Sequence, residues 1–187
     1  MKFLVTGGAG FIGSNIVKKL VSRGDHVTVI DNLITGKEKN LASVKDKIIL
    51  LKDSILNINL LENQTQNIDG IFHQAALASV QDSFSKPEEY QSVNVNGTEN
   101  ILKLAKKNNF KVVYASSSSV YGNPERIPIK ESDSKNPINP YAETKLAKEK
   151  LAKEYAEMGV KVIGLRYFNV FGKGQSKEYA GVLKLFL

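Results

Sequence analysis

A glycine-rich turn near the N-terminus constrains the fold of this chain more than any other sequence feature. The turn joins a short apolar run, Lys2–Thr6, to an amphipathic stretch, Phe11–Ser22, and it places glycines at positions 7, 10 and 13. Glycine adopts backbone angles that other residues avoid, and it lets a second group approach the main chain closely. No Gly-Lys-Ser or Gly-Lys-Thr sequence follows, so the turn is not a P-loop. The pattern predicts a strand, a tight turn and a helix whose N-terminus can hold a phosphate.

Short apolar runs alternate with helical patterns along the chain. The predicted strands are Lys2–Thr6, His26–Ile30, Ile48–Leu51, Gly70–His73, Lys111–Ala115 and Val160–Leu165. The predicted helices are Phe11–Ser22, Leu56–Gln66, Glu88–Lys107 and Tyr141–Glu157. The strands are apolar on both sides and rich in β-branched residues, as is typical of strands covered on both faces. This alternation predicts an α/β fold with a doubly wound parallel sheet, the Rossmann fold, and right-handed crossovers.

Two segments break the alternation. Gly122–Asn139 has no periodicity and contains three prolines, so it is expected to form a long loop of the kind that is usually functional or mobile. Val182–Leu187 has the pattern of an apolar helix that begins but has no stop signal. We therefore expect residues 1–170 to form one domain and residues 171–187 to begin a second lobe that is largely missing.

The composition excludes several classes of function. The 187 residues contain no cysteine and only two histidines, so disulfides, thiolate nucleophiles and metal sites are not expected. No apolar run approaches the roughly 20 residues of a membrane span, and the N-terminus lacks a signal peptide, so we expect a cytoplasmic protein without membrane contact. The net charge of +7 comes from lysines scattered over helical segments, which argues against nucleic acid as a partner. A basic surface also attracts anionic substrates such as nucleotides.

An acidic residue ends the second predicted strand. Asp31 follows Gly13 by about 20 residues, where a carboxylate can accept hydrogen bonds from both hydroxyls of an adenosine ribose. Its charge would also repel a 2′-phosphate on that ribose. Asp31 and Asn32 alone are equally compatible with a simple turn after a strand. Together with the glycine turn, they predict a site for NAD rather than NADP.

A tyrosine and a lysine share one face of the last predicted helix. Asn139 suits the N-cap and Pro140 the first helical position, so Tyr141 and Lys145 lie one turn apart. A cation beside a phenol favours the phenolate and lowers the pKa of the phenol, which would make Tyr141 a general base or acid. Taken alone, this spacing is common and also suits an ordinary surface helix.

A run of four serines follows the fifth predicted strand. In an open parallel sheet, ligands bind beyond the carboxyl ends of the strands, so Ser116–Ser119 and the glycine turn face the same crevice. A serine hydroxyl there can bind a substrate hydroxyl and relay its proton. A serine-rich turn without function is the alternative for each serine taken separately.

Together these features resemble the extended short-chain dehydrogenase/reductase family, and within it the NAD-dependent sugar-nucleotide epimerases and dehydratases. Further matching segments, in chain order, are Asp53, His73–Ala76, Asn94–Thr98, Ser117–Gly122 and Leu165–Asn169. The resemblance covers essentially the whole chain and is closest to UDP-glucose and UDP-N-acetylglucosamine 4-epimerases. It implies NAD as cofactor, a nucleotide sugar as substrate, no metal, and a homodimer.

The resemblance also implies roles for individual positions. The implied catalytic residues are Ser117, Tyr141 and Lys145. The implied cofactor-binding residues are Gly7, Gly10, Phe11, Ile12, Gly13, Asp31, Asn32, Asp53, Ser54, Ala75, Ala76, Asn94, Lys145, Tyr167 and Phe168. The implied substrate-binding residues are Ser79, Ser117, Ser118, Tyr141 and Asn169. We interpret His73 as a packed histidine at a strand end rather than a catalytic residue.

The implied reaction is epimerisation at C4 of the sugar. Tyr141 would take the proton of the O4 hydroxyl while a hydride passes from C4 to NAD, and the 4-keto sugar would then turn and receive the hydride on its other face. Lys145 would hold Tyr141 ionised and Ser117 would hold O4 in line. The cofactor carries the redox chemistry, and the protein orients the reacting groups and provides the electrostatic field around them.

Departures from the family pattern narrow the choice of reaction. The dehydratases of the family carry an Asp-Glu pair where this chain has Ser118 and Ser119, so dehydration is disfavoured. Some galactose epimerases carry a lysine at the position of Ala78. A uronate epimerase, a decarboxylase, a reductase and a non-catalytic NAD-binding fragment remain alternatives.

The implied homodimer would form through the helices Glu88–Lys107 and Tyr141–Glu157. Their apolar positions can equally belong to the internal core; they include Ile101, Leu104, Leu146 and Leu151.

Overall fold

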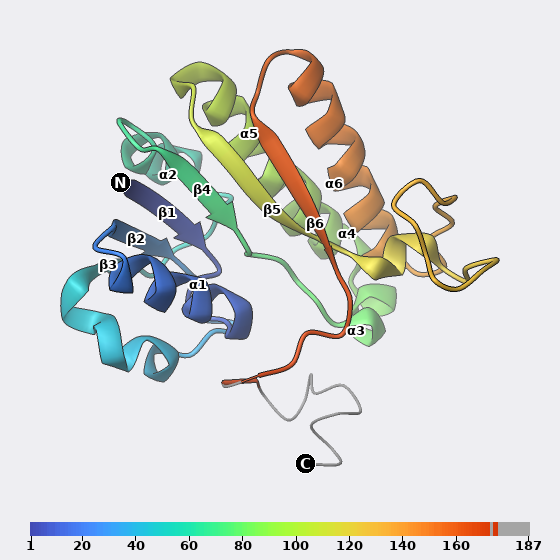
Figure 1. Cartoon of the computed structure of the whole chain (residues 1–187), viewed down its shortest axis with the longest axis horizontal. Helices are drawn as coiled ribbons and strands as arrows, with labels where there is room; N and C mark the ends of the chain where they lie inside the picture. Colours follow the sequence, from blue (N-terminus) through green and yellow to red (C-terminus); the bar gives the residue numbers. More distant parts are fainter. Residues whose placement is uncertain (173, 176–187) are drawn as a thin grey trace.

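The computed structural model describes residues 1–172, 174 and 175, which form an α/β fold around one parallel sheet (Figure 1). The six strands lie in the order β3-β2-β1-β4-β5-β6, and every neighbouring pair is parallel. Their bounds are β1 Lys2–Thr6, β2 His26–Ile30, β3 Ile48–Leu51, β4 Gly70–His73, β5 Lys111–Ser117 and β6 Val162–Tyr167. The strand order reverses between β1 and β4, as in a doubly wound sheet, and the predicted fold class is confirmed.

Helices cover the sheet on two sides. Helix α1 (Phe11–Ser22) and the 3₁₀ segment η1 (Glu38–Lys47) pack on one side, while α5 (Gly97–Asn108) and α6 (Pro140–Glu157) pack on the other (Figure 1). Successive residues of a strand point to opposite faces. Leu4 of β1 therefore joins the core under α5 and α6, and the next residue, Val5, joins the core under α1.

The strand predictions agree closely with the structure. The first four strands begin and end at the predicted residues, whereas β5 continues through Ser117 and β6 is shifted to Val162–Tyr167. The serine run was predicted to follow this strand. Its first two residues, Ser116 and Ser117, instead lie within β5 and pair with Arg166 and Tyr167 of β6.

The helix predictions need more correction. The predicted helix Glu88–Lys107 comprises α4 (Pro87–Tyr90), a π-helical turn η2 (Gln91–Asn96) and α5. The predicted helix Leu56–Gln66 is the shorter α2 (Ile58–Gln64). Three short elements were not predicted, namely η1, α3 (Val80–Ser85) and the 3₁₀ turn η3 (Ser118–Tyr121). Elements α3 and η3 carry too few residues to show a helical period, whereas η1 is a longer 3₁₀ segment in which Leu41 is the one buried residue.

The segment predicted as a long loop contains no regular element after Gly122. Its exposed side chains include Ile127, and an ion pair between Arg126 and Asp133 links two of its parts. Asn139 ends the loop and caps α6, because its side-chain oxygen accepts a hydrogen bond of 2.9 Å from the backbone N–H of Ala142. The predicted N-cap is confirmed.

Two further predictions concern the ends of the molecule and its surface. The predicted helix start at Val182–Leu187 lies outside the described residues, as does most of the predicted second lobe. Within residues 1–172, no helix is long and apolar enough to cross a membrane.

Most of the apolar positions assigned to a dimer interface are internal. Ile101 and Leu104 are buried in the core between the sheet and α5, and Leu151 packs against that core. Of the four positions, Leu146 alone lies outside this cluster, and it is half-buried. For the other three, the alternative of an internal core position is correct.

Candidate active site

The glycine turn lines a cavity at the carboxyl ends of β1, β2 and β4. The cavity has a volume of about 100 Å³. Gly7 has a φ of +67°, and a Cβ atom there would lie 2.6 Å from the backbone nitrogen of Ala75. Only glycine fits at this position, because the turn and the chain after β4 are in direct contact. The cavity gathers eight of the predicted cofactor residues: Gly7, Gly10, Asp31, Asn32, Asp53, Ser54, Ala75 and Ala76.

The Asp31 carboxylate is fixed against the glycine turn. One oxygen accepts a hydrogen bond of 2.8 Å from the backbone N–H of Ala9, and the other accepts one of 2.9 Å from the N–H of Leu33. Each carboxylate oxygen has a second lone pair that can accept a ribose hydroxyl. The buried carboxylate thus supports the turn and lines the cavity at the same time.

A buried amide nitrogen in the same cavity has no hydrogen-bond partner among residues 1–172, 174 and 175. Gln74 accepts a hydrogen bond of 3.2 Å from the Tyr167 hydroxyl, while its side-chain nitrogen Nε2 is buried and unpaired. A buried donor without a partner is costly and suggests that a ligand satisfies it. The glycine cradle, the Asp31 carboxylate and this donor fit a dinucleotide. The sequence showed Gln74 only as part of a matching segment, and its unpaired nitrogen depends on tertiary packing.

His73 belongs to the packing of the site and not to its chemistry. Thr98 Oγ1 donates to the carbonyl of Asn94, so it accepts from His73 Nε2 at 2.9 Å. The other ring nitrogen, Nδ1, then accepts from Thr6 Oγ1 at 2.7 Å. Burial, together with the charges of Lys148 and Lys145, holds the pKa of His73 well below its usual value. The ring is neutral and bonded on both sides, as expected for a packed histidine.

Asn94 braces the chain that follows β4. Its side-chain oxygen accepts from the backbone N–H of Leu77 at 2.8 Å, and its nitrogen donates to the carbonyl of Leu77 and to Thr144 Oγ1. The predicted approach of this amide to the cofactor is therefore indirect in this structure, because its hydrogen bonds hold the cavity wall against α6.

The three predicted catalytic residues lie together at the carboxyl edge of the sheet. Ser117 ends β5, and Tyr141 and Lys145 lie on the first turns of α6, with the Lys145 Nζ 5.4 Å from the centroid of the Tyr141 ring. Lys145 is buried and donates a hydrogen bond of 3.1 Å to the carbonyl of Ala115 on β5. This bond directs the lysine across the helix–strand interface, toward the end of the sheet.

The electrostatics of this pair differ from the prediction. Burial raises the pKa of Tyr141, and a hydrogen-bonding interaction with Ser117 opposes that rise. Burial also lowers the pKa of Lys145 to about 8. The predicted lowering of the phenol pKa was wrong for the protein without ligand, because desolvation of the phenolate dominates and the interaction that opposes it comes from Ser117 rather than from Lys145.

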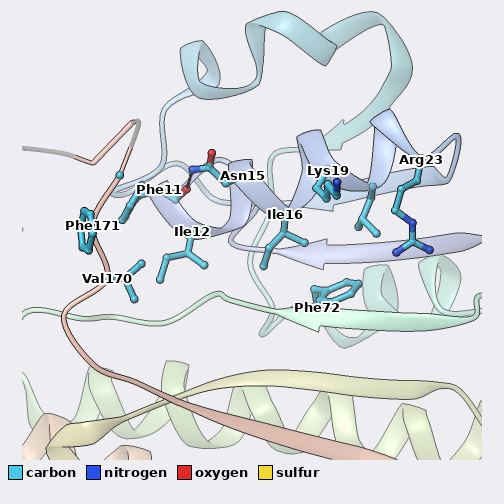
Figure 2. A pocket seen from close by; sticks show the side chains of 11 residues that line it. Phe11, Ile12, Asn15, Ile16, Lys19, Arg23, Phe72, Val170 and Phe171 are labelled. Atoms are coloured by element: carbon cyan, nitrogen blue, oxygen red, sulfur yellow. Dashed lines mark hydrogen bonds between the residues drawn. The ribbon is translucent and has the colours of Figure 1, made fainter.

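Several predicted site residues lie elsewhere. The side chains of Phe11 and Ile12 line a different and mostly apolar cavity of about 470 Å³, where Ile12 and Ile16 of α1 lie above Phe72 of β4 (Figure 2). Their predicted approach to the pyrophosphate is thus restricted to their backbone at the start of α1. Ser79 caps α3 by accepting from the N–H of Asp82. Phe168 and Asn169 are exposed after β6.

An ion pair next to the catalytic residues was not predicted. Arg166 of β6 makes two hydrogen bonds of 2.8 Å to the carboxylate of Glu149 on α6, and Ser116 donates to the same carboxylate at 2.6 Å. Arg166 also donates to the Tyr121 hydroxyl and to the carbonyl of Glu131. A half-buried bidentate pair with these additional hydrogen bonds fixes β5, β6, η3, α6 and the long loop relative to one another.

Comparisons with known proteins agree with this geometry. Residues 3–187 match the model of the NAD dependent epimerase/dehydratase family. The chain belongs to this family. A UDP-glucose 4-epimerase of Lacticaseibacillus casei is 40% identical over 92% of this chain and 52% of its own length. A UDP-N-acetyl-alpha-D-glucosaminuronate decarboxylase of Bacillus cytotoxicus is 38% identical over 98% of this chain and 59% of its own length.

A solved structure shows the same arrangement of the fold. A UDP-N-acetylglucosamine 4-epimerase of Methanobrevibacter ruminantium M1, in complex with UDP-N-acetylmuramic acid, superimposes with a TM-score of 0.92 at 40% identity. The match covers 97% of this chain and 60% of that one. The chain therefore spans about half to three fifths of the length of these family members.

Proposed function

We propose that this chain is the cofactor-binding and catalytic half of an NAD-dependent UDP-hexose 4-epimerase. The observation that carries the proposal is the grouping of Ser117, Tyr141 and Lys145 at the carboxyl edge of the sheet, the same edge that holds the cavity with the fixed Asp31 and with the Gln74 amide nitrogen, which is unpaired among the described residues. The complete activity belongs to a two-lobed enzyme, in which this half is joined to the C-terminal lobe of the family.

The residues of the chain divide the work between binding and proton transfer. When bound, NAD supplies reversible hydride acceptance at C4 of the sugar. Asp31 holds the adenosine ribose, and the N–H groups at the start of α1 face the pyrophosphate. Tyr141 takes and returns the O4 proton, Lys145 stabilises the phenolate, and Ser117 orients the O4 hydroxyl.

A decarboxylase is the second candidate, because a UDP-uronate decarboxylase is 38% identical to this chain. Product analysis on the two-lobed enzyme distinguishes the two functions. With UDP-glucose and UDP-N-acetylglucosamine, we expect the C4 epimers and no carbon dioxide from the matching uronates. Release of carbon dioxide without epimer formation would assign the chain to the decarboxylases instead.

The cofactor proposal predicts a clear change when Asp31 is replaced. Asp31→Ala is expected to weaken NAD binding by at least about tenfold, because a hydrogen bond to a charged group contributes about 1.5–3 kcal/mol. Binding of NADP should weaken less, because the repulsion of its 2′-phosphate is lost. Calorimetric titration of the 187-residue chain with each cofactor measures both effects.

The Asp31 experiment has a matched control and a variant that preserves shape. Asp46→Ala changes an exposed aspartate of η1 and should leave both affinities unchanged. Asp31→Asn keeps the shape of the side chain and one of the two acceptor oxygens that support the turn while removing the charge, so it tests how the charge affects discrimination between the cofactors. An unchanged preference for NAD in both Asp31 variants would refute the ribose assignment.

We further propose a homodimer through the surface of α3 and α6. Val80 and Phe84 of α3 are 41% and 62% exposed, and Leu146 of the adjacent α6 is half-buried. Phe84→Glu is expected to weaken dimerisation by about tenfold or more, because it places a charge in an apolar contact. Light scattering over a concentration series measures this. Ile127→Glu, on the exposed long loop, should leave the dimer intact, and an unchanged mass for Phe84→Glu would exclude this surface.

A further inference from the structure

The Ser117 hydroxyl is held by two donors from one residue. Its oxygen accepts a hydrogen bond of 3.1 Å from the backbone N–H of Ser119 and one of 2.9 Å from the Ser119 hydroxyl. A serine hydroxyl has two lone pairs and one proton. Because both lone pairs are engaged, Ser117 can act toward any other group only as a donor.

The group next to this proton is the Tyr141 phenol. Ser117 interacts with Tyr141 by a hydrogen bond that favours the phenolate, while Lys145 faces the same ring from α6. A donor stabilises the ionised form of an acid, whereas an acceptor would stabilise its neutral form. Whether the Ser117 hydroxyl donates to Tyr141 or accepts from it therefore affects how readily Tyr141 serves as a base.

We propose that Ser119 is a positioning residue that fixes the Ser117 hydroxyl as a donor directed at the Tyr141 oxygen. In the described part of the chain the Ser119 side chain hydrogen-bonds to Ser117, and it acts on Tyr141 only through that residue. The backbone N–H alone would leave one lone pair of Ser117 free to accept from the phenol. The hydrogen bond from the Ser119 hydroxyl occupies that lone pair. The catalytic meaning of the proposal rests on the proposed function, but the orientation of the hydroxyl does not.

The test measures the ionisation of Tyr141 in the 187-residue chain without cofactor or substrate. Tyrosine labelled with carbon-13 at the ring carbon next to the oxygen is titrated by NMR, and the Tyr141 signal is assigned by its loss in Tyr141→Phe. Ser119→Ala is expected to raise the pKa of Tyr141, shifting its ionisation about three- to tenfold toward the neutral phenol. Ser119→Thr, which keeps a hydroxyl, should restore the original value.

A second variant and a control keep the result interpretable. Ser119→Cys retains the size of the side chain but has a weak donor, so it should give a shift in the same direction if Ser119→Ala fails to fold. Ser132→Ala, on the exposed part of the long loop, should leave the Tyr141 signal unchanged. A lowered pKa in Ser119→Ala would mean that Ser117 donates to Ser119 instead, and it would overturn the proposal, as would no shift at all.

The kinetic consequence separates this proposal from the proposed function. In the two-lobed enzyme, Ser119→Ala should lower kcat with little change in KM and move the acid limb of the pH profile to higher pH. If the NMR shift is found but no epimerase activity exists, the proposed function fails and the positioning role stands. If epimerase activity exists without the shift, the positioning role fails alone.

Discussion

Replacing Tyr141 with phenylalanine is expected to lower turnover of the two-lobed enzyme by a factor of about 10²–10⁴, the usual contribution of a general acid–base group. Phenylalanine keeps the ring that faces Lys145 but lacks the oxygen that takes the O4 proton. NAD should remain bound, because the cavity that holds Asp31 and Gln74 is not lined by Tyr141. Steady-state rates with UDP-glucose and the NAD content of the purified protein test both parts.

The matched control for this variant lies on the same helix. Tyr155→Phe removes a hydroxyl about four turns further along α6, where the side chain packs at the edge of the core, and it should change neither rate nor cofactor content. A Tyr141→Phe enzyme that retains its rate would show that another group moves the O4 proton. A loss of NAD together with activity would assign Tyr141 to cofactor binding rather than to proton transfer.

The parts of the fold that the sequence predicted are those with strong local patterns. The run His26–Ile30 is apolar on both sides because helices cover both faces of the sheet there, so that Val29 joins one core and Ile30 the other, and the turns on either side limit its length. The cap at Asn139 was equally predictable, since a short polar side chain before a proline satisfies the free N–H groups of a helix start. These signals depend on neighbours in the sequence.

The elements that were missed depend on contacts with distant residues. The π-helical turn Gln91–Asn96 continues directly into α5, so the sequence shows one continuous helical period across it. Segment η1 carries three lysines, one glutamate and one aspartate, and Leu41 is its one buried residue. Neither element has a local pattern that distinguishes it from its surroundings.

The same distinction holds at the candidate site. Asp31, Ser117 and Tyr141 stand in motifs and were predicted, whereas the Glu149–Arg166 pair joins residues from α6 and β6 that no short motif connects. The direction of the Tyr141 pKa shift was also beyond the sequence. It is set by the balance between burial and the hydrogen bond with Ser117, and the spacing of Tyr141 and Lys145 gives neither of these.

Lys148 illustrates the energetic side of that balance. Its side chain is fully buried on α6, and its Nζ has no hydrogen-bond partner among the described residues. The amine faces the Tyr114 ring of β5, whose centroid is 5.5 Å away. Burial, and then the charge of Lys145, hold the pKa of Lys148 well below its usual value. The charge of Lys148 lowers the pKa of His73 on β4, but His73 is itself neutral and supplies no compensating charge.

A lysine with a lowered pKa in the folded state makes the protein less stable as the pH falls. Above the pKa of the unfolded chain, about 10.4, both states hold the neutral amine and the lysine has no pH-dependent effect. Below it, the unfolded state binds a proton that the folded state excludes, and the free energy of unfolding falls by about 1.4 kcal/mol for each pH unit. This loss ends only when the pH reaches the lower pKa of the folded state.

Lys148→Met is therefore expected to stabilise the chain, and the gain over the original protein should grow as the pH is lowered from 10 toward neutrality at about 1.4 kcal/mol per unit. Methionine fills nearly the same volume without a buried amine. Urea denaturation at several pH values measures the free energy of unfolding. Lys150→Met, an exposed position of the same helix, should change it by no more than about 0.5 kcal/mol at any pH. Equal pH slopes for the original chain and Lys148→Met would instead show that the Lys148 amine is charged in the folded protein.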